Sequence, residues 1–253
     1  MFIFSFSAKA QSPITFNIPS DNYVVTISDF GGCANVQDIE ITNTNNYNYS
    51  VGDNVFDGCG NLETVIFADG LTTIGYKAFF HCGSLIEVMF PATLKEIEAE
   101  AFVGCGLLTV DLSGTKITTI RYRAFFHCGS LIEVMFPATL EKIETQAFSN
   151  AGLLTVDLSG TKITTIGYQA FYYCGSLATV TFTRRTPPTF GTEAFWFINS
   201  ACLFYVPNDA YIAPINKLYG IAPGKIIVVP VPKEPFRGNI IVRGGATLII
   251  GKP

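Results

Sequence analysis

Apolar and polar residues alternate along this chain in short bursts that return at a regular interval. In residues 85–90 (LIEVMF), Val88 and Phe90 alternate with Glu87 and Met89. An alternation with a period of two predicts a short β-strand with one buried face. A proline follows directly. We expect the strand to end there, because proline cannot donate a hydrogen bond to a strand ladder.

An Ala-Phe pair marks the same point of each interval. Its phenylalanine recurs every 23 residues in five consecutive units, at Phe79, Phe102, Phe125, Phe148 and Phe171. The whole of residues 78–102 also recurs almost unchanged as 124–148, which is 46 residues later. A fixed period in the low twenties predicts a solenoid, in which one turn buries its apolar face only by stacking on its neighbours.

The leucines that begin the predicted strands show that small insertions and deletions alternate between coils. These leucines are Leu62, Leu85, Leu107, Leu131, Leu153 and Leu177. Their spacings are 23, 22, 24, 22 and 24, whereas the Ala-Phe spacing stays at 23. The length changes therefore cancel within each coil, as the loops of a solenoid allow.

The Leu-x-x-Val-x-Phe strand followed by Ala-Phe-x-x-Cys resembles the BspA-like branch of the leucine-rich repeat family. The resemblance covers about residues 33–206 and rests on many repeats rather than on one motif. It implies a β-rich, right-handed leucine-rich-repeat solenoid with N- and C-terminal caps, of roughly seven to eight coils of 22–24 residues. It also implies a cell-surface or secreted protein that binds other macromolecules, often host proteins, without known catalysis.

The pattern divides the chain into a central solenoid and two flanking parts. We expect an N-terminal cap at 13–32 and the solenoid at 33–231, which includes a C-terminal cap at 187–231. Residues 232–253 change to a different apolar pattern. They are interpreted as a linker and a β appendage, with the start of another domain as one interpretation. The chain would then be a fragment of a longer protein.

The first residues are ambiguous. In residues 1–12 (MFIFSFSAKAQS), the Ala-Lys-Ala before Gln11 has the small-x-small form of a signal-peptide cleavage site. The apolar run before it is too short for a complete signal, so a partial signal peptide and an ordinary N-terminal strand both stay open. No run approaches about 18 consecutive apolar residues, so no transmembrane helix is expected.

The amino-acid composition restricts the kinds of binding partner that we expect. Charged residues make up only 14% of the chain, the net charge is −4, and Arg184-Arg185 is the one basic doublet. Nucleic acid is not an expected partner, because phosphate binding needs a concentrated positive patch. The 22 phenylalanines fit a repeat protein with a phenylalanine spine. The expected partner is an extracellular protein or glycan, and the chain is expected to be a monomer.

Most of the seven cysteines follow the repeat. The regular ones are Cys59, Cys82, Cys105, Cys128 and Cys174, and Ala151 takes the vacant place in the series. Side chains one coil apart point the same way into the core rather than at one another. We therefore expect a ladder of buried, reduced cysteines, with disulfides and a metal site as the less favoured alternatives. Cys33 and Cys202 lie at opposite ends and are too far apart to pair with each other.

No chemical motif indicates catalysis. His81 and His127 occupy one repeat position, so two coils separate them by about 10 Å, too far to share a metal. Both are expected on the convex surface. Glu87 and Asp111 are diagonal neighbours about 8 Å apart, a separation that glycosidase carboxylates also show. They lie on an open sheet, however, without an aromatic cleft. We expect no enzyme activity, no cofactor and no metal.

The candidate binding face is the outer side of the strands. It consists of Glu87, Met89, Thr109, Asp111, Glu133, Met135, Thr155 and Asp157. Methionines in a regular row form adaptable contact surfaces, although duplicated sequence repeats its surface whether or not anything binds. The leading hypothesis is a non-catalytic, adhesin-like module that is secreted or at the cell surface. The alternatives are a structural spacer and the non-catalytic part of a larger carbohydrate-active protein.

Overall fold

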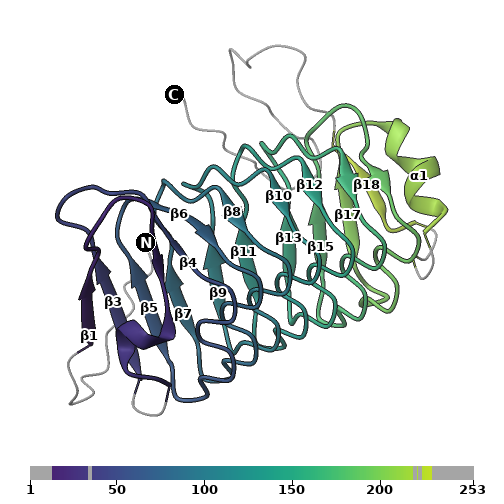
Figure 1. The fold of residues 1–253 in the computed structure, drawn as a ribbon. Coiled ribbons are helices and arrows are strands. Elements are labelled where there is room, and N and C mark those ends of the chain that lie inside the picture. The colour runs from purple at the N-terminus through teal and green to yellow at the C-terminus, as the bar shows by residue number, and fades with distance from the viewer. Residues whose placement is uncertain (1–12, 34–35, 219–220, 222–223, 230–253) are drawn as a thin grey trace, which may run out of the picture.

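The computed structural model describes residues 13–33, 36–218, 221 and 224–229, which form one elongated solenoid (Figure 1). The predicted leader at 1–12 and the predicted appendage at 232–253 lie outside the described residues. Helix is nearly absent from the described part, and parallel strands stack from the N-terminal end to the C-terminal end. The predicted repeat solenoid is therefore confirmed, with about nine turns rather than seven to eight.

One side of the solenoid is a broad surface of parallel strands. In order along the solenoid they are β1 (Ile14–Asn17), β3 (Asp38–Thr42), β5 (Thr64–Phe67), β7 (Glu87–Met89), β9 (Thr109–Asp111), β11 (Glu133–Met135), β13 (Thr155–Asp157), β15 (Thr179–Thr181), β17 (Leu203–Val206) and β18 (Ile226–Val228). The turn count exceeds the expectation because β1 and β18 pair in parallel with β3 and β17 and extend the stack at both ends.

The ladder of this surface is interrupted twice, between β7 and β9 and between β11 and β13. Both interruptions coincide with the places where successive strand leucines lie 22 residues apart. Spacings of 23 or 24 leave enough chain for the full ladder, as in the pair β9 and β11. One backbone hydrogen bond crosses each gap, from Leu108 to Ile86 and from Leu154 to Ile132.

A second row of short strands forms another side of each coil. These are β2 (Tyr23–Val25), β4 (Tyr49–Val51), β6 (Leu71–Ile74), β8 (Glu96–Ile97), β10 (Thr119–Ile120), β12 (Lys142–Ile143), β14 (Thr165–Ile166) and β16 (Thr189–Phe190). The sequence did not predict them, because a strand of two residues is too short to show alternation. Each strand from β6 to β14 in this row ends on a fully buried isoleucine, such as Ile97 or Ile143.

The third side of each coil is a tight turn with two residues in the left-handed region. In the coil of residues 77–81, Lys77 and His81 have φ of 53° and 57°. The second of these positions recurs through the solenoid at Gly58, His81, Gly104, His127, Asn150, Tyr173 and Phe197. Glycine and asparagine adopt this conformation most easily, so the histidines and aromatic residues occupy it at some conformational cost.

The core follows the predicted phenylalanine spine. Phe56, Phe79, Phe102, Phe125, Phe148, Phe171 and Phe195 are fully buried, and neighbouring rings stack with centroids 4.9–5.5 Å apart. Offset stacking at this distance stabilises aromatic pairs beyond the burial of their area. Because the separation of the rings equals the separation of the coils, one phenylalanine per coil builds a continuous column.

The cysteine ladder is confirmed for its inner members. Cys82, Cys105, Cys128 and Cys174 are buried, and each thiol donates to the carbonyl oxygen of the spine phenylalanine 26 residues earlier, at 2.9–3.2 Å. Burial raises the pKa of the Cys128 and Cys174 thiols to about 12, so both remain protonated at neutral pH. The ladder contributes packing and polar satisfaction rather than reactivity.

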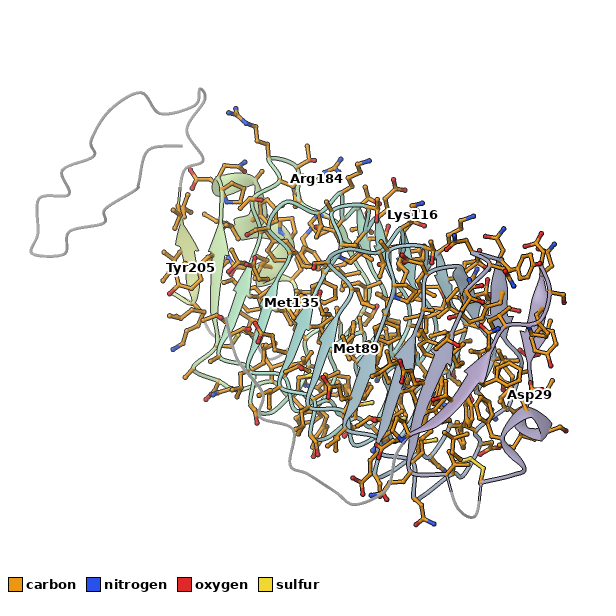
Figure 2. The ribbon with its side chains drawn as sticks, turned by 90° about the vertical axis from the view of Figure 1, so that its left-hand side faces the viewer. Asp29, Met89, Lys116, Met135, Arg184 and Tyr205 are labelled. Carbon is orange, nitrogen blue, oxygen red and sulfur yellow. A yellow bond between two sulfur atoms is a disulfide. The ribbon has the colours of Figure 1, made fainter. Side chains whose placement is uncertain are left out.

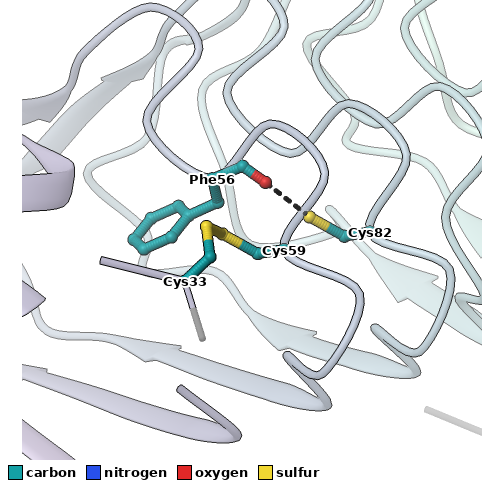
Figure 3. Close-up of a disulfide and its surroundings, with 4 residues drawn as sticks. All are labelled: Cys33, Phe56, Cys59 and Cys82. Atoms are coloured by element: carbon teal, nitrogen blue, oxygen red, sulfur yellow. Dashed lines mark hydrogen bonds between the residues drawn. A yellow bond between two sulfur atoms is a disulfide. The ribbon is translucent and has the colours of Figure 1, made fainter. Parts of the chain in front are cut away.

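At the N-terminal end the prediction of reduced cysteines is wrong, because Cys59 forms a disulfide with Cys33 (Figure 3). Their Cα atoms lie 5.0 Å apart, within the range for a disulfide. Cys33 stands one 23-residue repeat before Phe56 in the sequence. Cys33 therefore stands where the repeat would have another phenylalanine, whose carbonyl oxygen would accept a hydrogen bond from the Cys59 thiol. The disulfide replaces that hydrogen bond.

Short helical segments flank the solenoid. The helical turns are η1 (Ile27–Phe30), η2 (Asp209–Tyr211) and α1 (Ile212–Asn216). Asn208 caps η2 by accepting a hydrogen bond from the Ala210 amide at 2.9 Å, a role that asparagine commonly fills. Pro214 lies in the first turn of α1, where its missing donor costs little. The described residues contain no helix long and apolar enough to cross a bilayer.

Candidate binding faces

The strand face, defined as the outer side of β5 to β15, carries the eight residues predicted as a binding face. The strand register places Glu133 opposite Thr109, and Met135 opposite Asp111. It likewise pairs Met89 with Ile66 on β5. The two predicted outward columns therefore exist, with the interruptions described above. Figure 2 shows Met89 and Met135 on this side of the solenoid.

The two methionines and the acids of this face are exposed, but the acids do not all serve the same purpose. Met89 and Met135 expose 51% and 41% of their surface. Asp111 accepts hydrogen bonds from the amide and hydroxyl of Ser113, at 2.9 and 2.7 Å. Asp157 accepts from the Ser159 amide at 2.9 Å. The two aspartates therefore fix the turns that end their strands.

A row of exposed aliphatic side chains on the same face was missed from the sequence. It consists of Ile86, Leu108, Ile132 and Leu154, each 42–47% exposed. Consecutive members are joined by backbone hydrogen bonds of 2.9–3.2 Å, so the row is continuous across four coils. Each member directly follows a buried strand leucine and lies two residues before a buried valine. The alternation of the strand would therefore have placed it inward.

The acids of this face are open to solvent. Glu87 and Glu133 are both exposed. Two hollows, of about 390 and 430 Å³, lie on other parts of the solenoid and are lined by none of the eight predicted residues. Within the described residues, no group of three or more His, Cys, Asp or Glu side chains is arranged to hold a metal ion.

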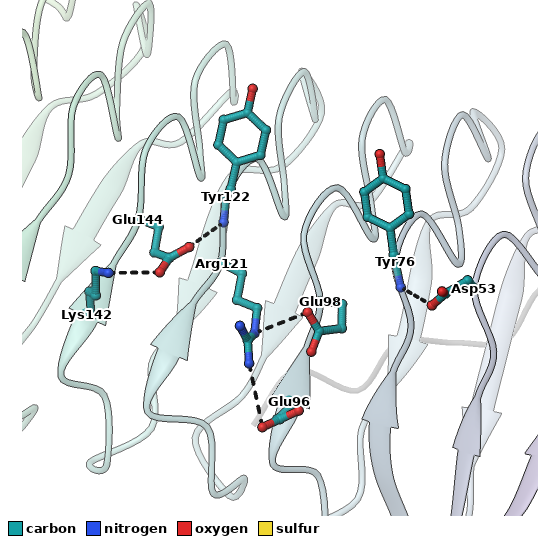
Figure 4. Close-up of polar contacts among 8 residues, drawn as sticks. All are labelled: Asp53, Tyr76, Glu96, Glu98, Arg121, Tyr122, Lys142 and Glu144. Atoms are coloured by element: carbon teal, nitrogen blue, oxygen red, sulfur yellow. Dashed lines mark hydrogen bonds and ion pairs between the residues drawn. The ribbon is translucent and has the colours of Figure 1, made fainter.

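The side formed by the second row of strands carries charges that pair with each other (Figure 4). Arg121 lies between Glu98 and Glu96, with nitrogen–oxygen distances of 3.4 and 3.6 Å. Lys142 contacts Glu144 at 2.9 Å. Exposed pairs of this kind contribute little stability, about 1 kcal/mol or less. Their effect is to neutralise this side, so it offers no concentrated charge to a partner.

The turn face, defined as residues 76–81, 99–104, 122–127, 145–150, 168–173 and 192–197, is held by a polar ladder across the coils. Arg123 Nε donates to Gln146 Oε1 at 2.7 Å, and Gln146 Nε2 donates to Gln169 Oε1 at 2.8 Å. Gln169 Nε2 in turn donates to Glu193 at 2.6 Å. In the earlier coils, Lys77 and Glu100 form an ion pair at 3.3 Å.

Aromatic rings are the other notable component of the turn face. His81 and His127 are exposed here, as predicted, and each contacts the preceding phenylalanine with ring centroids 4.0 and 4.3 Å apart. Further along, Tyr173 and Phe197 are exposed and contact each other at 5.1 Å. These rings could not be grouped from the sequence, because their common surface depends on the turn conformation.

Comparison with known proteins identifies the family of this chain and solved structures that share its fold. The sequence profile of the BspA type leucine rich repeat region matches residues 4–128 and 114–213, in six copies. Comparison with curated protein sequences finds no significant match.

Solved structures share the fold at low sequence identity. A leucine rich cell surface protein from Faecalibacterium prausnitzii A2-165 superposes with a TM-score of 0.55 at 20% identity, over 76% of this chain and 68% of that chain. A leucine-rich repeat protein of T. pallidum gives a TM-score of 0.54 at 21% identity, over 87% of each chain. These likenesses concern the fold alone. Because the family profile covers most of the chain, this protein belongs to the BspA-type leucine-rich repeat family.

Proposed function

We propose that this protein is a non-catalytic interaction module, secreted or at the cell surface, that binds another macromolecule through its strand face. The observation that carries the proposal is the continuous aliphatic row of Ile86, Leu108, Ile132 and Leu154. The column that begins at Glu87 separates this row from the exposed Met89 and Met135. Contiguous exposed apolar side chains on a soluble protein mark interaction sites. The row is not part of the buried core of these coils.

The composition of the strand face favours a protein over a glycan as its ligand. Isoleucine, leucine and methionine offer apolar contact and few hydrogen bonds, and methionine adapts its shape to the partner. The neighbouring Glu87 and Glu133 add an acidic border that favours a partner with basic side chains around an apolar centre. We expect a protein ligand whose binding surface repeats along two or more coils.

Two observations support an extracellular location. The disulfide between Cys33 and Cys59 is a bond that persists in oxidising compartments and is rare in the cytosol. The Faecalibacterium prausnitzii protein of the same fold is described as a cell surface protein. The family membership and the open, cleft-free strand face support an interaction role without catalysis.

The test is a binding screen of the purified chain against extracellular-matrix proteins and a glycan array, with two matched variants. The first variant carries Ile86→Lys, Met89→Lys, Ile132→Lys and Met135→Lys on the strand face. The control variant carries four lysines at exposed positions away from that face, Ala92→Lys, Ala138→Lys, Thr118→Lys and Thr164→Lys. Both variants gain the same charge, so they separate loss of the surface from a general electrostatic effect.

We expect the wild type and the control to bind one ligand alike, and the strand-face variant to bind it at least about tenfold more weakly. Circular dichroism checks that both variants keep their fold. Equal binding by both variants would move the site away from the strand face. Absence of any ligand at micromolar concentration would favour a structural spacer instead.

A further inference from the structure

A hollow of about 430 Å³ on the turn face lies between two identical Phe-His pairs. Phe80 and His81 form one wall, and Phe126 and His127 form the other, two coils along the solenoid. The nearly buried Val103, from the coil between them, also lines the hollow. Glu100 and Arg123 complete the lining.

The hollow exists because the middle coil has glycine at its second left-handed position. His81, Gly104 and His127 occupy this position in three successive coils. A Cβ atom at Gly104 would lie 2.8 Å from Cδ2 of His81. The backbone conformation alone does not require glycine, because asparagine and tyrosine adopt it at Asn150 and Tyr173. Gly104 is therefore needed for the space that it leaves beside His81.

The second copy of the 46-residue unit provides a natural comparison. Val103 and Gly104 of the first copy correspond to Ser149 and Asn150 of the second. Asn150 projects a side chain where Gly104 has none, and its amide donates to the Ser149 hydroxyl at 3.3 Å. The same repeat position thus has no side chain in the first copy, at Gly104, and has one in the second copy, at Asn150.

The width of the hollow selects the shape of the ligand. Two coils separate the backbones of His81 and His127 by about 10 Å. A flat aromatic ring sandwiched between two rings at van der Waals contact needs about 7 Å. The space is too wide for such a sandwich and suits a thicker, non-planar ring of similar diameter.

The lining groups select the chemistry. The rings of Phe80 and Phe126 offer apolar surface, and cations cover one side of each, with Lys77 Nζ and Arg123 Cζ both 4.7 Å from the ring centroids. One oxygen of Glu100 contacts Lys77, and Arg123 uses its Nε toward Gln146. Within the described residues no hydrogen bond is made by the second Glu100 oxygen or by the two terminal nitrogens of Arg123.

We propose that this hollow binds one saccharide ring of a glycan. A pyranose is thick and non-planar, its C–H groups pack on aromatic rings, and its hydroxyls both donate and accept hydrogen bonds. The hollow offers an acceptor in Glu100, donors in Arg123, and groups of either kind in the imidazoles of His81 and His127. Apolar walls with a few convergent polar groups are typical of small-ligand sites. This site is separate from the strand face and does not depend on the function proposed there.

The experiment measures binding of free monosaccharides, including glucose, galactose, mannose and N-acetylglucosamine, to the whole chain by saturation-transfer NMR. The imidazole resonances of His81 and His127 are followed in the same titrations. The test variant is Gly104→Asn, which fills the hollow with the residue that the chain uses at position 150. The matched control is Gly58→Asn, which has the same left-handed backbone (φ 70°) and no atom within 4 Å of the added Cβ.

We expect at least one monosaccharide to bind saturably and to shift both imidazole resonances. Gly104→Asn should weaken this binding by at least about tenfold, and Gly58→Asn should leave it unchanged. Circular dichroism confirms the fold of both variants. The proposal is overturned if no saccharide binds, or if Gly104→Asn binds as the wild type does. It is also overturned if N-acetyl-tyrosinamide shifts the two imidazoles and the sugars do not, because the hollow would then be a site for a peptide side chain.

Discussion

The two copies of the 46-residue unit, residues 78–123 and 124–169, share one strand face and differ on the turn face. The strands of the strand face and the aliphatic row beside them are identical in sequence. The copies differ at nine positions, which in the first copy are Lys95, Glu96, Ala99, Glu100, Val103, Gly104, Cys105, Arg121 and Arg123. Most of these positions lie in or next to the turn face, and two on the second row of strands exchange a lysine with a glutamate.

This difference separates what folding requires from what the surface is free to vary. Two buried positions change between the copies: Cys105 becomes Ala151, which is also small, and Val103 at the turn face becomes Ser149. The strand face is presented twice, about 10 Å apart, so a ligand there meets the same groups in each copy. On the turn face the hollow lies at Gly104 of the first copy, where the second copy has Asn150, so a ligand there does not meet the same groups in each copy.

The largest expected effect comes from breaking the shared interior. Phe125→Ala, at the start of the second copy, removes a fully buried ring that stacks on Phe102 and Phe148 at 5.4 and 5.3 Å. We expect a loss of about 3–5 kcal/mol in the free energy of unfolding, measured by urea denaturation. Phe126→Ala, on the turn face, is half-buried and should cost clearly less. Equal costs for the two would contradict the distinction between interior and surface.

The second prediction uses pH to test the thiol of Cys128, a member of the cysteine ladder in which Ala151 takes one place. Burial raises the pKa of Cys128 to about 12, while an unfolded thiol ionises near 8.5. Above about pH 8.5 the unfolded state loses a proton that the folded state keeps, so stability falls as pH rises, by about 1.4 kcal/mol per pH unit for this thiol until about pH 12.

Cys128→Ala gives position 128 of the cysteine ladder the alanine that stands at position 151, one coil later. The variant should be somewhat less stable than the wild type at pH 7, because it loses the thiol hydrogen bond to Phe102. Between pH 9 and 11 its stability should fall less steeply, measured by urea denaturation at each pH. Parallel pH profiles would show that the thiol ionises equally in both states.

The parts of this molecule that repeat could be predicted from the sequence. Features that depend on residues outside the repeat, or on how neighbouring coils stack, could not. The period located the phenylalanine column and the strands. The disulfide was missed because Cys33 lies 26 residues before Cys59, outside the 23-residue series. The aliphatic row was missed because Leu107 and Leu108 read together as core residues. The hollow was missed because it depends on the side chain that Gly104 lacks, which only the stacking of coils reveals.

The third prediction concerns close contacts that both copies share. A Cβ atom at Gly152 would lie 2.3 Å from the carbonyl oxygen of Gly129, one coil earlier, and the same holds for Gly106 and Gly83. Gly152→Ala should therefore destabilise the protein by about 1–3 kcal/mol. Gly129→Ala, where no atom lies within 4 Å of the added Cβ, should change stability little. Similar unfolding midpoints for the two variants would show that coil spacing is looser than the contacts indicate.

The smallest effect is expected for a variant that converts part of the first copy into the second. The triple variant Val103→Ser, Gly104→Asn and Cys105→Ala gives the first copy the sequence of residues 149–151. Each new residue already occupies the equivalent place one unit later, so the backbone needs no new conformation. At position 104 the new Cβ would lie 2.8 Å from Cδ2 of His81, so the imidazole must turn aside. The lost thiol bond from Cys105 to Phe79 is partly offset, because asparagine has less freedom than glycine in the unfolded chain. We expect a net change within about 1 kcal/mol in urea denaturation. A cost several times larger would mean that these residues are adjusted to Glu100 and Arg123, and that the turn face of each copy is a co-adapted unit rather than a variable surface on a fixed interior.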